Sequence, residues 1–309
     1  MRRFYKIHDF CFLLSTNCDN AGVLLERLFP SLHTVSAEYS AEWHLQRDAE
    51  HSGIPLYNVY ADGKAALQAE TLNKALDYLE WSITTRILHA HRHFLQVHAA
   101  ALVAEEGALI LVGPSGAGKS SLALSLLVQG WKCLSDEIVF IDPSTFRLFC
   151  FPRSFHIGYE TLRHFPTLDM GDDVLAFTDA SGKSRIDPAL ITSEWTSITA
   201  HPWCLVFPIH GPDYVTVLTP LGETPSLLLL AAQALNLGDF GIRGLDALAH
   251  FVGQCDSYML TSSDISSAAL ILSRLTKNSG GNTKPPCKYD DHRRYTSDRN
   301  KEGTIPVGV

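Results

Sequence analysis

The sequence lacks the features that define several broad classes of protein. Its seven cysteines include no Cys-x-x-Cys pair, and their odd number argues against a complete disulfide framework. The longest strongly apolar run, Leu227–Leu235, contains Gln233 and is too short to span a bilayer. Acidic residues outnumber basic residues, 33 to 25, so no basic excess points to nucleic acid. We therefore expect a soluble, cytoplasmic protein with no nucleic-acid partner and no membrane span.

The distribution of apolar residues predicts two folded parts. The chain has 309 residues, 46% of them hydrophobic, which is enough for two modest domains. Residues 1–94 show no recognisable chemistry, but Phe10–Leu14 and Leu56–Tyr60 have the composition of strands. In Leu72–His89, apolar residues recur at helical spacing. We therefore expect a small N-terminal α/β domain over residues 1–94.

Residues 95–277 alternate between strand-like and helix-like segments, which predicts a second α/β domain. The predicted strands are Leu95–Val103, Ala108–Val112, Trp131–Ser135, Ile138–Ile141, Leu148–Phe151, Trp203–Pro208 and Val215–Leu218, and the predicted helices are Lys119–Val128, Leu227–Leu237, Leu245–Val252 and Ile265–Leu275. The turn residues Gly211-Pro212-Asp213 predict a hairpin between the last two strands. From residue 278 the sequence is polar and rich in Gly and Pro, which predicts a disordered tail over residues 278–309.

The segment Gly113–Ser120, GPSGAGKS, matches the phosphate-binding loop G-x-x-x-x-G-K-[ST] in its required strand–loop–helix context. Glycines let backbone N–H groups point at phosphate oxygens, and the helix N-terminus adds partial positive charge. Lys119 can reach the β- and γ-phosphates, and the Ser120 hydroxyl can hold Mg²⁺. The residues expected to bind the nucleotide are Gly113, Pro114, Ser115, Gly116, Ala117, Gly118, Lys119, Ser120 and Ser121.

Two polar features flank this loop. Asp136-Glu137 follows a predicted strand beside the loop, where carboxylates can coordinate Mg²⁺ or accept a proton from an attacking hydroxyl. His98 lies on the strand before the loop strand, where we expect it near Asp136 as a partner of a general base. The same residues also fit a solvated acidic turn and a packed core histidine. The neighbouring loop favours function for the acidic pair, whereas the two interpretations of His98 are balanced.

A third feature, the alternating histidines His89, His91 and His93, invites a metal-site interpretation. Residues two apart do not share a helix face, and no acidic partner is obvious in the sequence. A solvated or loosely packed histidine cluster is therefore the favoured interpretation.

These motifs, in this order, resemble the HPr kinase/phosphorylase superfamily. Val97-His98-Ala99 matches its histidine motif, Gly113–Ser120 its loop, Gln129-Gly130-Trp131 the segment after its helix, and Asp136-Glu137 its acidic pair. The stretch HAAALVAEEGALILVGPSGAGKSSLALSLLVQGWKCLSDEIVFIDP is most similar to the HPr-related kinase A branch, which includes kinases of peptide-modification clusters. A weaker resemblance extends over most of residues 75–275.

The resemblance implies a fold and a set of roles. The fold is a phosphate-loop α/β core with a mixed sheet, related to phosphoenolpyruvate carboxykinase. Lys119 and the loop amides would hold the triphosphate of ATP, and Ser120 would ligate Mg²⁺. Asp136 would act as general base toward a serine hydroxyl, assisted by His98. The members with known assemblies also leave a homo-oligomer open for this chain.

Three other residues have roles implied by the same resemblance. Glu137 would be a second acidic group near the metal, and Arg153 and Lys183 would contact phosphate or substrate. The chain departs from the family over Phe151–Glu160, where a glycine-rich signature linked to the reverse, phosphorolytic reaction is absent. The resemblance therefore does not extend to phosphorolysis or to HPr as the acceptor.

The sequence leads to one main hypothesis and two alternatives. The main hypothesis is an ATP- and Mg²⁺-dependent kinase that phosphorylates a serine hydroxyl on a small protein or peptide. The first alternative is a nucleotide-binding adaptor or switch without phosphoryl transfer. The second is a kinase acting on a small molecule, because acceptor pockets of this kind have no motif.

Overall fold

The computed structural model describes the whole chain except residues 31, 36–37, 49–54, 166–177, 180 and 279–309. It is a mixed α/β structure with two large sheets, as expected, and the segment predicted as a disordered tail lies outside the described residues from position 279 onward. The helices are α1 (Asp19–Leu28), α2 (Leu72–Ala90), α3 (Lys119–Val128), α4 (Tyr159–Leu162), η1 (Pro188–Leu190), α6 (Glu223–Ala231), α7 (Leu237–Phe240), α8 (Ile242–Gly253) and α9 (Ile265–Asn278).

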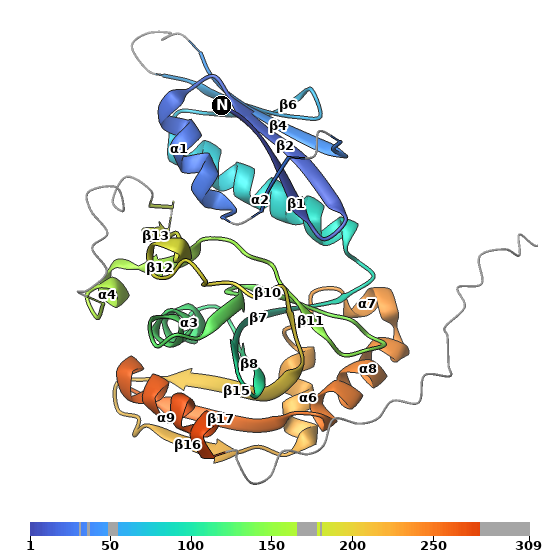
Figure 1. Cartoon of the computed structure of the whole chain (residues 1–309), viewed down its shortest axis with the longest axis vertical. Helices are drawn as coiled ribbons and strands as arrows, with labels where there is room; N and C mark the ends of the chain where they lie inside the picture. Colours follow the sequence, from blue (N-terminus) through green and yellow to red (C-terminus); the bar gives the residue numbers. More distant parts are fainter. Residues whose placement is uncertain (31, 36–37, 49–54, 166–177, 180, 279–309) are drawn as a thin grey trace, which may run out of the picture.

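The N-terminal sheet has six strands in the order β3-β1-β2-β4-β5-β6 (Figure 1). Its strands are β1 (Arg2–Ile7), β2 (Phe10–Thr16), β3 (His33–Thr34), β4 (Ala41–Arg47), β5 (Tyr57–Ala61) and β6 (Lys64–Ala69). The predicted strands at β2 and β5 and the predicted helix α2 are confirmed, whereas β1, β4 and β6 were not predicted. In β4 the residues Ala41, Trp43 and Leu45 are buried and alternate with partly exposed ones, because one sheet face packs on α1 and α2.

The second sheet has nine strands in the order β14-β11-β10-β7-β8-β15-β17-β16, with β9 paired to β7. Its strands are β7 (Leu95–Ala104), β8 (Gly107–Val112), β9 (Lys132–Ser135), β10 (Ile138–Ile141), β11 (Leu148–Phe149), β14 (Thr199–Ala200), β15 (Pro202–His210), β16 (Val217–Pro220) and β17 (Asp256–Ser262), and a separate ribbon pairs β12 (Phe155–Gly158) with β13 (Lys183–Ile186). Strands β8, β15 and β17 are parallel, whereas β7, β10 and β16 run antiparallel to their neighbours. This is the mixed sheet that the motif resemblance implies.

Helices cover both faces of the nine-stranded sheet. Along β7, Ala100 and Leu102 lie in one apolar cluster with α3 and α9, and Ala99 and Ala101 lie in another with α6 and α8. Figure 1 shows α3 and α9 on one side of the sheet and α6 and α8 on the other. A strand that is buried on both faces has a nearly continuous apolar sequence. This pattern explains why β7 and β8 were predictable.

Two predictions in the second half of the domain are wrong. The strands β15 and β16 do not form a hairpin, because β17 lies between them and pairs with both. The predicted helix over Leu227–Leu237 also does not exist as one element, since α6 ends at Ala231 and Leu237 begins α7. Between them the Leu235 N–H donates to the carbonyl oxygen of Gln96 at 2.7 Å. Pairing with β7 thus replaces the helix there.

The N-terminal part packs directly onto one end of the nine-stranded sheet. Ile138 and Phe140 of β10, together with Phe151, belong to the same apolar cluster as Leu76 and Leu79 of α2. The shared cluster means that one face of α2 packs against both parts of the molecule, so the helix is not a free linker. Residues on this face of α2 therefore lie close to the segments that follow β10.

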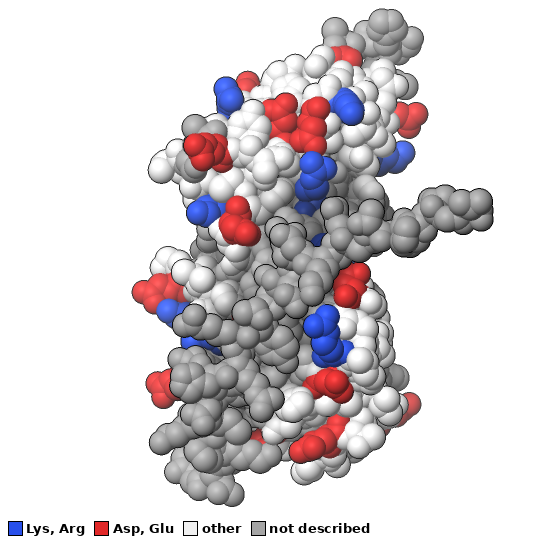
Figure 2. All heavy atoms as spheres, turned by 90° about the vertical axis from the view of Figure 1, so that its right-hand side faces the viewer, with Lys and Arg blue, Asp and Glu red and all other residues white. Residues whose placement is uncertain are grey.

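The charge distribution on the surface and the lengths of the helices bear on the expected partners. On the face in Figure 2, Lys and Arg side chains lie among Asp and Glu side chains rather than in one basic patch, for the residues coloured there. Within the described residues, every helix is too short or too polar to cross a membrane.

Candidate active site

The loop between β8 and α3 has the backbone that its glycines allow. Gly116 and Gly118 adopt φ values of +86° and +87°, in the left-handed region that favours glycine. Gly113 has a different constraint, because a Cβ there would lie 3.2 Å from the Cβ of Ala117. The loop therefore curls tightly, with its amide groups near the N-terminus of α3.

Lys119, the first residue of α3, is turned back over this loop. Its side chain is buried, and its Nζ donates to the carbonyl oxygens of Gly113 at 2.7 Å and Pro114 at 3.0 Å. Burial lowers the pKa of Lys119, and the nearby carboxylates of Asp136 and Glu137 act in the opposite direction. The N-terminus of α3 and the Lys119 ammonium group both place positive charge at this loop, which favours a bound anion.

The pairing of β7 brings the acidic turn close to this loop. Strands β9 and β10 both pair with β7, and the turn Asp136-Glu137 joins them. Ala99 of β7 pairs with Val112, the last residue of β8, while its N–H donates to the carbonyl oxygen of Glu137 at 3.0 Å. The acidic turn and the beginning of the loop are therefore separated by a single strand.

Asp136 occupies an unusual electrostatic position. It is only 4% exposed, and among the described residues its Oδ1 has no hydrogen-bond partner. Burial raises the pKa of Asp136 to about 7, although Arg153 and the Ser120 hydroxyl favour its ionised form. Asp136 in turn stabilises the charged form of Lys119. The structure thus brings together the carboxyl group, the loop serine and the loop lysine.

Glu137 and Arg153 form an ion pair beside Asp136. The Arg153 guanidinium contacts Glu137 through Nη2, and it is also 3.6 Å from Glu80 through Nη1. Arg153 is buried, whereas the Glu137 side chain is 39% exposed. Arg153 is therefore close to the loop site, but its two arms are directed at carboxylates.

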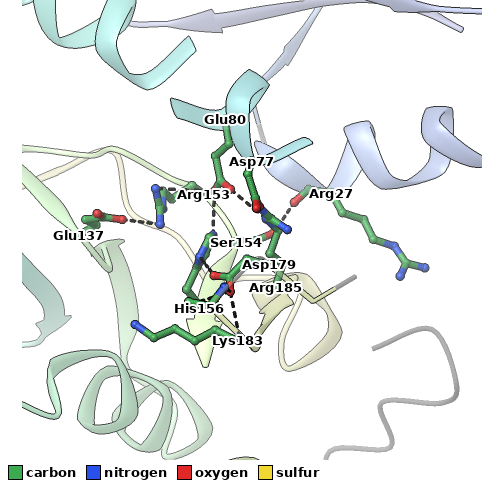
Figure 3. Close-up of polar contacts among 11 residues, drawn as sticks. Arg27, Asp77, Glu80, Glu137, Arg153, Ser154, His156, Asp179, Lys183 and Arg185 are labelled. Atoms are coloured by element: carbon green, nitrogen blue, oxygen red, sulfur yellow. Dashed lines mark hydrogen bonds and ion pairs between the residues drawn. The ribbon is translucent and has the colours of Figure 1, made fainter. Parts of the chain in front are cut away.

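Lys183, the other basic residue considered from the sequence, begins β13. Its main-chain N–H donates to Oδ1 of Asp179 at 2.9 Å, while its side chain points away from Asp179 (Figure 3). The charge of Lys183 acts to lower the pKa of Lys119. Lys183 therefore lies within electrostatic reach of the loop.

His98 lies on the expected strand, but its ring has a different partner from the one expected. His98 pairs with Ile138 in the sheet, and its main-chain N–H donates to the carbonyl oxygen of Gln233 at 2.8 Å. Burial lowers the pKa of His98, as does the charge of Lys119, and a side-chain hydrogen bond with Gln233 opposes them. Among the described residues, no hydrogen bond joins His98 to Asp136.

A pocket of about 180 Å³ opens on the opposite side of the loop from Asp136. Strands β15 and β17 line it at their C-terminal ends, and these strands lie on one side of β8 while β7 and the acidic turn lie on the other. Its apolar wall includes Leu122, Leu260 and Ile265, and its polar groups include His210 and Asp264. Ligands in open α/β sheets bind at this edge.

Of the three histidines His89, His91 and His93, two are solvent-exposed, as the favoured interpretation expects, but the middle one is not loosely packed. His89 and His93 are exposed, but His91 is fully buried. The Nδ1 of His91 lies 2.8 Å from the carbonyl oxygen of Ile87, and its Nε2 lies 3.0 Å from Asp9. The described residues contain no group of three or more His, Cys, Asp or Glu side chains suited to a metal ion.

A buried ionic network behind the site was not predicted from the sequence. It comprises Asp77, Glu80, Arg153, His156, Asp179 and Arg185 (Figure 3). One signal was available, because Glu80 lies on the apolar face of α2 with Leu76, Leu79 and Ile83. A charged residue on the buried face of a helix indicates a partner elsewhere in the fold.

Comparison with known proteins finds structural similarity but no sequence match. No known protein-family profile matches the chain, and no curated protein matches its sequence. Among solved structures, the chain is similar to the Hpr(Ser) kinase/phosphatase from Coxiella burnetii, with 11% sequence identity and a TM-score of 0.33, covering 59% of this chain and 94% of that one.

Proposed function

We propose that the chain is an ATP- and Mg²⁺-dependent kinase that transfers the γ-phosphoryl group to a hydroxyl, namely a serine of a small protein or peptide. The observation that carries this proposal is the position of Asp136, a buried carboxyl group with a pKa of about 7 next to Ser120 and Lys119. A general base is most effective when its pKa lies near the working pH. A phosphate-binding loop alone would support only nucleotide binding.

Each residue near the loop has a defined task in this proposal. The loop amides and Lys119 bind the triphosphate, and Asp136 accepts the proton of the attacking hydroxyl. Ser120, Asp136 and Glu137 supply the hard oxygen donors that Mg²⁺ prefers, and the unpartnered Oδ1 of Asp136 fits such a ligand. Bound Mg²⁺ would neutralise charge on the phosphate oxygens. His98 tunes the electrostatics of the site, with Lys183 and Arg153 contributing positive charge.

The pocket beside the loop fits the nucleoside end of the same ligand. It lies across the loop from Asp136, so a triphosphate whose γ-phosphate faces Asp136 directs its nucleoside toward Leu122 and Ile265. The apolar wall suits the faces of a base, and Asp264 and Ser262 offer polar contacts at the rim.

The choice of a peptide or protein serine as acceptor is supported by the order of the motifs. Val97-His98-Ala99, the loop and Asp136-Glu137 follow one another as in HPr-related kinases. The same resemblance is the basis for proposing ATP as the nucleotide and for considering a homo-oligomer.

The test is transfer of label from γ-labelled MgATP to a pool of serine-containing peptides and proteins. We expect Asp136→Asn to abolish transfer while MgATP affinity stays within a few-fold, because the variant loses the base but keeps the loop and a side-chain oxygen for Mg²⁺. Asp213→Asn, which changes an exposed carboxylate outside both the loop and the lining of the pocket, is the matched control.

Three outcomes would contradict the proposal. Transfer that survives in Asp136→Asn would show that the base is wrongly assigned. Nucleotide binding by the wild-type chain without any labelled product would favour an adaptor or switch. Label recovered only in small molecules would show that the acceptor class is wrong.

A further inference from the structure

Glu80 is a charged residue in an environment that disfavours charge. It lies on the apolar face of α2 beside Leu76, Leu79 and Ile83, and it is only 4% exposed. An isolated buried carboxylate is strongly unfavourable unless partners surround it. The partners of Glu80 therefore indicate why the position is occupied by an acid.

Both carboxylate oxygens of Glu80 contact basic side chains that lie in the ribbon of β12 and β13 or just before it. Oε1 lies 2.8 Å from Nε2 of His156 and 3.6 Å from Nη1 of Arg153, and Oε2 accepts from Nε of Arg185 at 2.8 Å. Figure 3 shows Glu80 reaching from α2 toward these residues, with Asp77 beside it on the same helix. An acid from the N-terminal part thus neutralises a basic cluster of the other part.

Arg153 connects this cluster to the acidic turn. One arm of its guanidinium lies near Glu80, and the other arm contacts Glu137, the neighbour of Asp136. A guanidinium is planar and rigid, so fixing one arm also orients the other. Glu80 and Glu137 are therefore coupled through a single side chain.

The main chain at Arg153 is also attached to the N-terminal part. The next residue, Ser154, donates from its N–H to the carbonyl oxygen of Leu28 at 3.3 Å and from its hydroxyl to the carbonyl oxygen of Arg27. These carbonyls lie at the C-terminal end of α1. Both the backbone and the side chain of this segment are therefore held by elements of the N-terminal part.

We propose that Glu80 is a positioning residue for phosphoryl transfer, which holds Arg153 so that Glu137 and Asp136 face the phosphate-binding loop. This inference rests on the proposed kinase function. It gives the N-terminal part a catalytic purpose, because its helix α2 supplies the counter-charge for an arginine of the site. Without Glu80, Arg153 is available to pair with Glu137 and Asp136 alone, which draws both carboxylates away from the metal and the acceptor.

The experiment compares Glu80→Gln with Asp77→Asn in the full chain. Asp77 lies on the same helix and pairs with Arg185, whereas Glu80 also contacts Arg153, so the two variants remove different contacts of the same network. We expect Glu80→Gln to lower kcat by about 10- to 100-fold, as a misplaced catalytic group does, with KM for MgATP within about threefold. Asp77→Asn should leave kcat within about twofold. Thermal unfolding of both variants measures the structural effect separately.

A second pair of variants tests whether Glu80 acts through Arg153. It also provides a variant in which loss of a buried charge does not by itself disturb folding. If Glu80 acts through Arg153, then Glu80→Gln/Arg153→Gln is no slower than Arg153→Gln alone, because the two changes are not additive. The double variant also removes one acid and one base together, which keeps the buried charge balanced. Glu80→Asp, which retains the charge, should recover part of the lost kcat.

The outcomes separate this inference from the proposed function. Equal kcat values for Glu80→Gln and Asp77→Asn, or additive losses in the double variant, would overturn the role of Glu80 while wild-type transfer stands. Absence of transfer by the wild-type chain overturns the kinase proposal itself, and the role of Glu80 with it.

Discussion

Two buried carboxyl groups, in two regions of the molecule, lie in opposite electrostatic environments. Asp136, in the turn beside the phosphate-binding loop, and Glu80, on α2 of the N-terminal part, are each 4% exposed. At Asp136 burial dominates and raises the pKa to about 7. At Glu80 burial acts in the same direction, but Arg153, His156 and Arg185 outweigh it and lower the pKa to about 2.

The difference between these regions lies in the number of partners, not in the depth of burial. Both oxygens of Glu80 contact basic groups, whereas among the described residues Oδ1 of Asp136 has no hydrogen bond. A satisfied carboxylate stabilises the fold that surrounds it, and an unsatisfied one keeps a reactive oxygen at the expense of stability. The comparison therefore supports the chemical role proposed for Asp136 and the positioning role proposed for Glu80.

The comparison predicts opposite effects of removing the two negative charges. At pH 8, Glu80→Gln should destabilise the fold by about 3 kcal/mol, because it leaves buried basic groups without their counter-charge. Asp136→Asn should stabilise the fold by on the order of 3 kcal/mol, because wild-type Asp136 must ionise against a pKa raised to about 7. Urea unfolding of both variants measures these changes, with Asp213→Asn expected within about 0.5 kcal/mol of wild type. Changes of the same sign would break the comparison.

The sequence made the chemical region much easier to predict than the supporting one. The predicted helix Lys119–Val128 and the predicted strand Ile138–Ile141 are confirmed at both ends. Both elements lie within one continuous segment of the chain, and their residue patterns follow the periodicity of the local helix or strand. Candidate site residues could be chosen there because the loop motif and the acidic turn are close together in the chain.

The features that were missed depend on contacts between distant segments. Strand β17 lies between β15 and β16, although the local turn signal favoured a hairpin. The buried His91 contacts Asp9, and Glu80 contacts Arg153 and Arg185, all of which are distant in the sequence. No local pattern specifies these partners, so only the presence of an acid on an apolar helix face could be noticed in advance.

Acid should remove the contribution of Glu80 to stability in a defined pH range. Its pKa is about 2 in the folded protein and near 4.5 without the fold, so its stabilising effect is complete above about pH 4.5. The effect is lost as pH falls through about 2, and amounts to about 3 kcal/mol. The free energy of unfolding, measured from pH 6 to pH 2, should therefore fall less steeply for Glu80→Gln than for wild type. Parallel curves would show that Glu80 has no special role in acid stability.

The pH dependence of phosphoryl transfer should test the environment of Asp136, the other carboxyl group of the comparison. In the proposed kinase, Asp136 is a base only when it is ionised, so kcat/KM should fall about tenfold for each pH unit below its pKa, which is about 7. The measurement is the rate of label transfer from MgATP between pH 5 and pH 9. Asp213→Asn should give the same profile as wild type. A profile that is flat from pH 5 to pH 7 would show that another group accepts the proton.

The smallest expected effect concerns the nucleoside end of the site, which neither carboxylate touches. Ile265, at the start of α9, lines the pocket beside the loop, whereas Leu270 of the same helix is 50% exposed. Ile265→Trp should weaken MgATP binding roughly tenfold by filling the pocket, a loss of about 1.4 kcal/mol. Leu270→Trp, which adds the same ring elsewhere on the helix, should leave the affinity unchanged in a calorimetric titration. If the two variants bind MgATP equally well, the nucleoside lies elsewhere, while the assignments of Asp136 and Glu80 are unaffected because neither depends on this pocket.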